Sequence, residues 1–203
     1  MNRLFTLVTC LIIGQTMLAQ NGDNKEPALK FKVEINGEKY QVADGEEITV
    51  NGNTIKINSS DVKTFDFENL TFDYPKNFAF EFDEDIDVKS WMLDGNNFVV
   101  SYFLFDGDIT IEAFADDMVR ILKRENCRVV DREIKLHGKV YQGKRINVSV
   151  FGEKLTYDIY KLDSDDYRSH IISFQDSKNA DGSDSKESIE TIKLIRDTIK
   201  IKS

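Results

Sequence analysis

The chain has 203 residues, of which 40% are hydrophobic, and its formal net charge is −9 at pH 7. This length fits one domain with a small appendage, and the apolar content is sufficient for a folded core. Because nucleic-acid binding requires a basic surface that neutralises phosphates, the acidic charge excludes a general nucleic-acid-binding protein.

Residues 1–19 have the organisation of a secretory signal peptide. One positive charge, Arg3, precedes an apolar run from Leu4 to Ile13, and small and polar residues follow around Ala19. This run is too short for a transmembrane helix, which needs about 20 apolar residues. We therefore predict export to the periplasm or the extracellular space, with no membrane span in the mature protein.

The two cysteines have separate interpretations. Cys10 lies inside the signal peptide, and Thr9 before it is larger than the Gly or Ala of a lipoprotein cleavage site, which disfavours lipidation. Cys127 then remains as a single thiol, so an internal disulfide is excluded in the mature chain. It precedes a strand-like run, and we predict a buried thiol that packs as a small apolar residue.

The N-terminal part of the mature chain predicts a leader followed by an appendage. Residues 20–29 are polar and contain Pro27, which is typical of a flexible leader. Within 30–60, the segments VEINGEKYQV (33–42) and ITVNGNTIKI (48–57) each place Asn-Gly between two alternating runs. Asn-Gly favours a type I′ turn, so we predict two β-hairpins.

Residues 64–203 predict the main domain. The apolar run 98–105 is typical of a central strand, and a 3.6-residue apolar period predicts a helix over 111–122, capped by Asp108 or Thr110. Asp184, with Glu187 three residues later, predicts the start of a last helix. The other predicted strands are 70–74, 78–82, 90–93, 127–136, 139–151, 154–162 and 167–175. This pattern predicts an α+β fold, an antiparallel sheet flanked by two helices.

Three segments of the main domain resemble a known family. NLTFDYPKNF (69–78), the lone Trp91 and the closing ESIETIKLIRDTIKI (187–201) are similar to a PsbP-like (DcrB-like) domain over residues 64–203. The resemblance implies an αβα sandwich whose members are mostly accessory or binding proteins. It implies no shared active site, so it assigns no functional residue.

The histidine and acidic side chains that could carry catalysis or bind a metal do not form a recognisable site pattern. Of the two histidines, His137 lies beside a turn glycine, and His170 alternates with apolar residues as a hydrogen-bonded sheet residue does. The acidic positions 83, 85 and 87 lack the Gly and Glu that an EF-hand loop requires. We therefore predict a non-enzymatic protein with no catalytic residue, no cofactor and no metal site.

The charges are unevenly distributed along the chain. Segment 81–117 contains eleven acidic residues and one lysine, whereas segment 120–145 is strongly basic. In one interpretation, the two segments compensate each other across the folded surface. In the other, a basic patch attracts an anionic envelope partner. That patch would consist of Arg120, Lys123, Arg124, Arg128 and Arg132.

These observations favour an exported accessory or binding protein that recognises an envelope protein or polymer. A carrier of a small molecule or metal ion, using space between sheet and helices, is the alternative. A hydrolase is the third hypothesis, and it requires a pair of carboxylates in a deep cleft with aromatic side chains that stack on the substrate.

Overall fold

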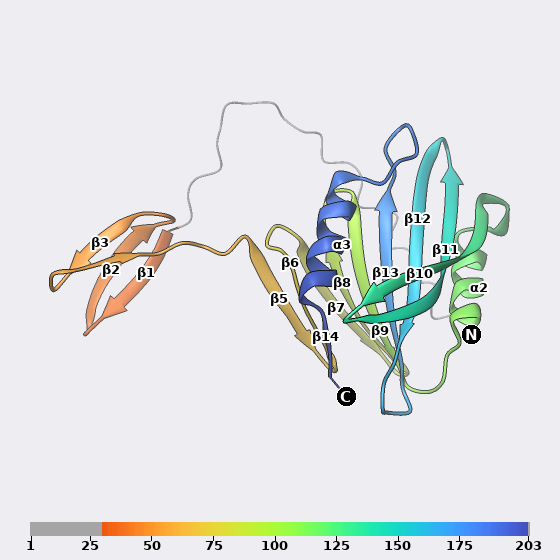
Figure 1. Cartoon of the computed structure of the whole chain (residues 1–203), viewed down its shortest axis with the longest axis horizontal. Coiled ribbons are helices and arrows are strands. Elements are labelled where there is room, and N and C mark those ends of the chain that lie inside the picture. The colour runs from red at the N-terminus through yellow and green to blue at the C-terminus, as the bar shows by residue number, and fades with distance from the viewer. Residues whose placement is uncertain (1–29, 203) are drawn as a thin grey trace. The chain divides into compact units, whose positions relative to one another are not determined.

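The computed structural model describes residues 30–202 (Figure 1). The predicted signal peptide (1–19) and leader (20–29) lie outside the described residues. The chain divides into two compact units, one ending at Asp61 and the other beginning at Val62. Neither helix within residues 30–202 is long and apolar enough to cross a membrane.

The first unit consists of two antiparallel hairpins. Its strands are β1 (Lys30–Ile35), β2 (Glu38–Ala43), β3 (Glu47–Val50) and β4 (Asn53–Lys56). The connections form at the two Asn-Gly pairs, where Asn36 and Asn51 have φ angles of 52° and 50°. A type I′ turn requires positive φ at both central residues, which is why the Asn-Gly signal located these hairpins.

The second unit contains a large and a small antiparallel sheet. The large sheet has the order β10 (Cys127–Leu136), β11 (Lys139–Val150), β12 (Glu153–Leu162), β13 (Ser169–Ser177), β9 (Phe98–Phe105), β8 (Val88–Asp94) and β7 (Ala79–Asp85). The small sheet has the order β14 (Lys200–Ile201), β6 (Leu70–Pro75) and β5 (Val62–Phe67). Strand β7 therefore forms one edge of the large sheet.

Two α-helices of the described chain accompany these sheets, α2 (Ile111–Ile121) and α3 (Lys186–Thr198). The Thr110 hydroxyl caps α2 by accepting from the backbone N–H of Ala113 at 3.1 Å. The cap of α3 is Ser185, which accepts from the N–H of Ser188 at 3.0 Å. The prediction that Asp184 caps this helix is wrong, because its carboxylate binds Lys178 instead.

The two helices lie against opposite faces of the large sheet. Lys144 of β11 lies 3.5 Å from Glu112 of α2. The next residue, Arg145, points to the other face and binds Asp158 of β12. That second face is the one covered by α3, because Arg145 and Asp158 line a cleft together with Ile192 of α3.

The small sheet shares the second face with α3, and aromatic side chains join it to the large sheet. Phe65 of β5 stacks on Phe72 of β6, with ring centroids 4.8 Å apart. The same ring meets Trp91 of β8 and Tyr102 of β9 edge to face at 6.3 Å and 5.9 Å. All four side chains are buried, so this cluster is the centre of the core.

The predicted α+β sandwich, a sheet flanked by two helices, is wrong in its class. The described chain is 56% strand and 16% helical, and is therefore mostly β. The prediction missed β5, because residues 58–63 were interpreted as a polar spacer and no strand was assigned between them and residue 70. In the structure β5 pairs with β6 across a tight turn at Glu68, whose φ is 53°. A second sheet, together with α3, therefore covers the face of the large sheet that lies opposite α2.

Gly143 of β11 lies where the packing of the large sheet leaves no space for a side chain. A Cβ at this position would lie 2.1 Å from the carbonyl oxygen of Ile159 and 2.5 Å from Cδ1 of Tyr160. We expect Gly143→Ala to lower the free energy of unfolding by about 1–3 kcal/mol, because the backbone must shift. Urea denaturation measures this loss, and Ser149→Ala, at an exposed position on the same strand, should change it by at most about 0.5 kcal/mol. Equal effects of the two substitutions would contradict the close contact.

Candidate binding surface

Three exposed phenylalanines gather beside the β7 edge of the large sheet. Phe80 and Phe82 of β7 are 43% and 49% exposed, and Phe67, the last residue of β5, is 38% exposed. The rings of Phe67 and Phe80 stack with centroids 5.5 Å apart. Trp91 lies beneath them, 5.3 Å from Phe82 and 5.7 Å from Phe67. We call these three phenylalanines the aromatic edge.

The strand register explains how the sequence places them there. Phe80 lies opposite Leu93 and Phe82 opposite Trp91, so both point to the face that carries the small sheet. Further along that face the apolar side chains are buried, but β7 is exposed along its whole length. Contiguous exposed apolar surface on a folded protein marks an interaction site more often than a single exposed side chain does.

The other face of β7 is acidic. Glu81, Asp83 and Asp85 alternate with the phenylalanines and lie opposite Met92, Ser90 and Val88 of β8. Within residues 30–202, no lysine or arginine lies within ion-pair distance of these three carboxylates. The prediction ended the strand at residue 82 and placed Asp83 and Asp85 in a loop after it, whereas the strand continues to Asp85. In the described part of the chain, no group of three or more histidine, cysteine or acidic side chains is arranged to hold a metal ion.

The five residues of the predicted basic patch are divided between two faces of the protein. Arg120 belongs to α2 and binds Asp117, and Arg124 lies 4.0 Å from Asp116, also of α2. Lys123 lies between them, before the short 3₁₀ helix η1 (Arg124–Asn126). Arg128 and Arg132 belong to β10 and share the face of Arg145, opposite α2. The structure therefore brings the five together only as two separate groups.

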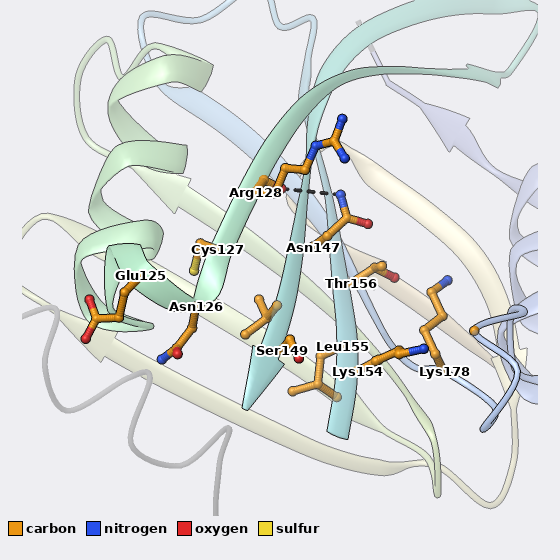
Figure 2. A pocket seen from close by; sticks show the side chains of 12 residues that line it. Glu125, Asn126, Cys127, Arg128, Asn147, Ser149, Lys154, Leu155, Thr156 and Lys178 are labelled. Carbon is orange, nitrogen blue, oxygen red and sulfur yellow. Dashed lines mark hydrogen bonds between the residues drawn. The ribbon is translucent and has the colours of Figure 1, made fainter. Parts of the chain in front are cut away.

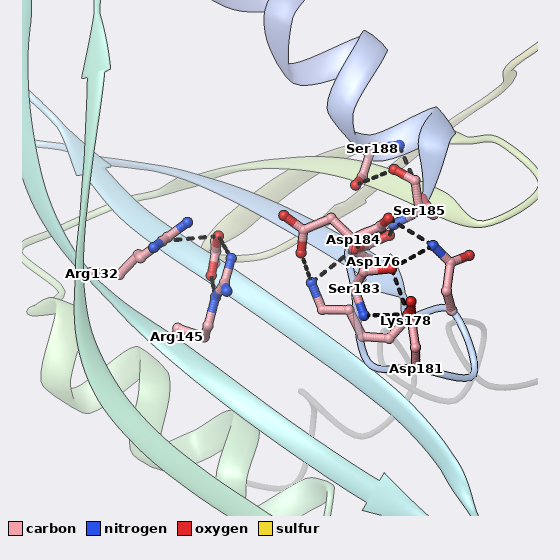
Figure 3. Close-up of polar contacts among 11 residues, drawn as sticks. Arg132, Arg145, Asp176, Lys178, Asp181, Ser183, Asp184, Ser185 and Ser188 are labelled. Carbon is pink, nitrogen blue, oxygen red and sulfur yellow. Dashed lines mark hydrogen bonds and ion pairs between the residues drawn. The ribbon is translucent and has the colours of Figure 1, made fainter.

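Much of the basic charge is neutralised by nearby acids, and Figure 3 shows this for Arg132 and Arg145. Arg145 donates two hydrogen bonds to the buried carboxylate of Asp158, at 2.5 Å and 2.6 Å. Arg132 lies 3.6 Å from the same carboxylate. Because Arg145 and Asp158 are direct cross-strand neighbours, their pairing follows from the register of β11 and β12, which the linear charge count does not reveal.

A shallow pocket of about 390 Å³ lies at the ends of β10, β11 and β12 (Figure 2). Its lining includes Cys127, Arg128, Lys154 and Lys178, but Lys178 is neutralised by Asp176 and Asp184. Cys127 is half-buried rather than fully buried as predicted. Burial, together with the nearby acid Glu125, raises the pKa of its thiol, which disfavours the reactive thiolate.

His170 is a buried structural residue with both ring nitrogens hydrogen-bonded. The Tyr102 hydroxyl lies 2.6 Å from its Nδ1, and Asp166 lies 3.1 Å from its Nε2. Burial lowers the pKa of His170, although hydrogen bonding to Asp166 opposes this effect. Neutral His170 can therefore accept from Tyr102 and donate to Asp166. The ring has no exposed surface through which it could reach a substrate.

Asp166 connects this buried group to the surface. Partial burial opposes its ionisation, but hydrogen bonds from Arg168 and Ser164 hold the pKa of its carboxyl well below the usual range. Arg168 also lies 3.4 Å from Glu68, in the turn between β5 and β6. The network thus links the large sheet to the small one.

Comparison with known proteins adds little to this description. No family model matches the chain, and no curated protein matches it. A solved structure titled "Crystal Structure of Protein of Unknown Function PA94 from Pseudomonas aeruginosa, Putative Regulator" is 10% identical and covers 58% of this chain and 84% of its own. Its TM-score is 0.27, a likeness that carries no argument. The PsbP-like resemblance stays a prediction.

The buried His170 predicts a specific pH dependence of stability. Because burial lowers the pKa of His170 below its ordinary value of 6.5, the unfolded chain binds more proton at this residue than the folded protein does as the pH falls through 6.5. We therefore expect the free energy of unfolding to fall below pH 6.5, by at most about 1.4 kcal/mol per pH unit. His170→Gln should remove this component of the slope in urea titrations, and His137→Gln should keep it.

Proton NMR of the histidine rings tests the same assignment without a substitution. The His170 signals should titrate with a midpoint below pH 6.5, because burial disfavours the charged form and lowers the pKa. A titration midpoint at or above 6.5 would show that the ring is hydrated or paired as a cation.

Proposed function

We propose that this protein is an exported, non-enzymatic binding protein that recognises another protein through its aromatic edge. The observation that carries the proposal is the exposure of Phe67, Phe80 and Phe82 as one contiguous group. Aromatic side chains provide large contact areas at little cost in conformational entropy. Their cluster on the buried Trp91 supports a preformed surface, since the floor under the rings is fixed by the core.

A protein partner is favoured over a polysaccharide by the backbone beside the rings. Strand β7 ends the large sheet, so the outward N–H and C=O groups along it are open to another strand. A polysaccharide would use ring faces and side-chain hydrogen bonds, but has no backbone that could extend the sheet. A protein segment can use both the rings and the edge.

Export and the absence of catalysis are part of the same proposal. Export depends on the predicted signal peptide at residues 1–19, so the partner would be a periplasmic, envelope or extracellular protein. The non-enzymatic assignment is supported by the states of two reactive side chains. His170 is buried with both nitrogens bonded, and the pKa of Cys127 is raised.

Photo-crosslinking tests the proposed surface in cells that make the protein. With p-benzoylphenylalanine in place of Phe82, we expect irradiation to give a discrete crosslinked species, because this ring lies in the interface. The matched control carries the same photoreactive residue at Ile189 of α3, which is 57% exposed and belongs to an element outside the aromatic edge. Equal yields at the two positions would show that the edge is not a specific binding surface.

A stability measurement separates binding from folding. Because Phe82 is half exposed, Phe82→Ser should cost less than about 1 kcal/mol of unfolding free energy, whereas Phe65→Ala in the core should cost about 3–5 kcal/mol. A cost of similar size at Phe82 would assign the ring to the core and remove the reason for the proposal.

A further inference from the structure

We propose that the partner supplies an extended basic segment, with lysine or arginine alternating with apolar residues, which adds to β7 as an eighth strand. This inference rests on the proposed binding function and specifies the chemistry of the partner. It follows from three properties of β7: its position at the sheet edge, the difference between its two faces, and the lack of any cation within residues 30–202 near the three carboxylates of its second face.

The position of β7 allows a strand to be added. The strand pairs with β8 on one side, from Ala79↔Asp94 to Asp85↔Val88, and no strand within residues 30–202 pairs with it on the other. All seven of its residues are exposed. In an edge strand, alternate residues direct their N–H and C=O groups outward, where an extended segment can form a ladder with them.

The two faces of β7 require different side chains from that segment. An added strand keeps the side-chain period of two, so residues beside Phe80 and Phe82 point to the aromatic face. The residues between them point to the face of Glu81, Asp83 and Asp85. Apolar side chains suit the first face and cations the second, since opposite charges on neighbouring strands attract.

The carboxylates on the acidic face are available for such a partner. Of the four acids in β7, Glu84 lies on the aromatic face and 3.8 Å from Lys89. Glu81, Asp83 and Asp85 lie on the other face, and no described cation lies within ion-pair distance of them. A segment with lysine or arginine at alternate positions would supply the missing countercharge.

The same charges disfavour the β7 strand of a second copy of the protein as the strand that adds to this edge. An antiparallel pair centred on Phe82 would place Glu81 against Asp83 twice and Phe80 against Glu84. Like charges on directly opposed positions destabilise a strand pair. The acidic face therefore selects against self-association through β7 and in favour of a basic segment.

Peptide binding to the full mature protein tests the inference. The probe is the fluorescently labelled peptide Lys-Val-Lys-Phe-Lys-Val-Lys, and the controls are its Glu-for-Lys analogue and a peptide with the four lysines grouped together. Anisotropy should show binding of the alternating basic peptide, with both controls weaker by about tenfold or more, because they mismatch charge or alternation. In ¹⁵N NMR, the largest shifts should fall on β7 residues.

Charge exchange separates strand pairing from general attraction to an acidic protein. The double variant Glu81→Lys, Asp83→Lys should bind the basic peptide about tenfold or more weakly and should bind the Glu analogue better than the wild type does. The matched control, Asp116→Lys with Asp117→Lys on exposed positions of α2, makes the same charge change away from the edge. It should leave basic-peptide binding within about twofold of the wild type. Equal losses in both double variants would overturn the inference.

Backbone methylation tests the ladder itself. Methylating alternate peptide nitrogens, in one register and then in the other, removes the N–H groups of one peptide edge at a time. One of the two peptides should bind like the parent and the other should lose binding, because only one edge faces β7. Equal binding by both would exclude strand addition.

The outcomes distinguish this inference from the proposed function. If the photoreactive residue at position 82 captures a partner but the basic peptide does not bind, the binding surface stands and the basic strand is wrong. If position 82 gives no more crosslinking than position 189, the proposed function itself is wrong.

Discussion

The structure depends on how a seven-stranded sheet buries its two faces with only two α-helices in the described chain. Helix α2 packs on one face, while α3 and the small sheet share the other. The aromatic cluster of Phe65, Phe72, Trp91 and Tyr102 is the contact that holds the small sheet in place. Without it, the second face would expose its apolar side chains to water.

The small sheet and α3 cover only part of the second face, and the uncovered part includes the aromatic edge. The small sheet buries Trp91 but reaches β7 through Phe67 and does not cover it, so Phe80 and Phe82 remain half exposed above a rigid floor. A floor fixed by core packing orients the exposed rings before any partner arrives, which lowers the entropic cost of binding. The proposed binding surface is thus a consequence of where the second layer ends.

The sequence predicted those parts whose signal is local. Asn-Gly turns and the helical period over 111–122 depend on neighbouring residues, and both were found. The second sheet was missed because β5 has a weak pattern of its own and is identified by its pairing with β6. The aromatic edge was missed for a related reason: the alternation of phenylalanine and acid over 78–85 was visible, but not that β7 would lie at a sheet edge. The predicted basic patch neglected the alternation of side chains along β10, which places Arg128 and Arg132 on the face opposite α2.

The acidic residues of β7 protect an exposed edge from aggregation and still leave it open to a basic segment. An edge that carries three phenylalanines nearby is a template for aggregation, and charges along such a strand are a common protection. Protection by a single sign of charge is selective, since it repels acidic and identical edges but not a basic one. Neutral polar residues would protect less and would not discriminate between partners. The sequence alternation of Phe80, Glu81, Phe82 and Asp83 therefore fits a surface that must stay open without pairing with itself.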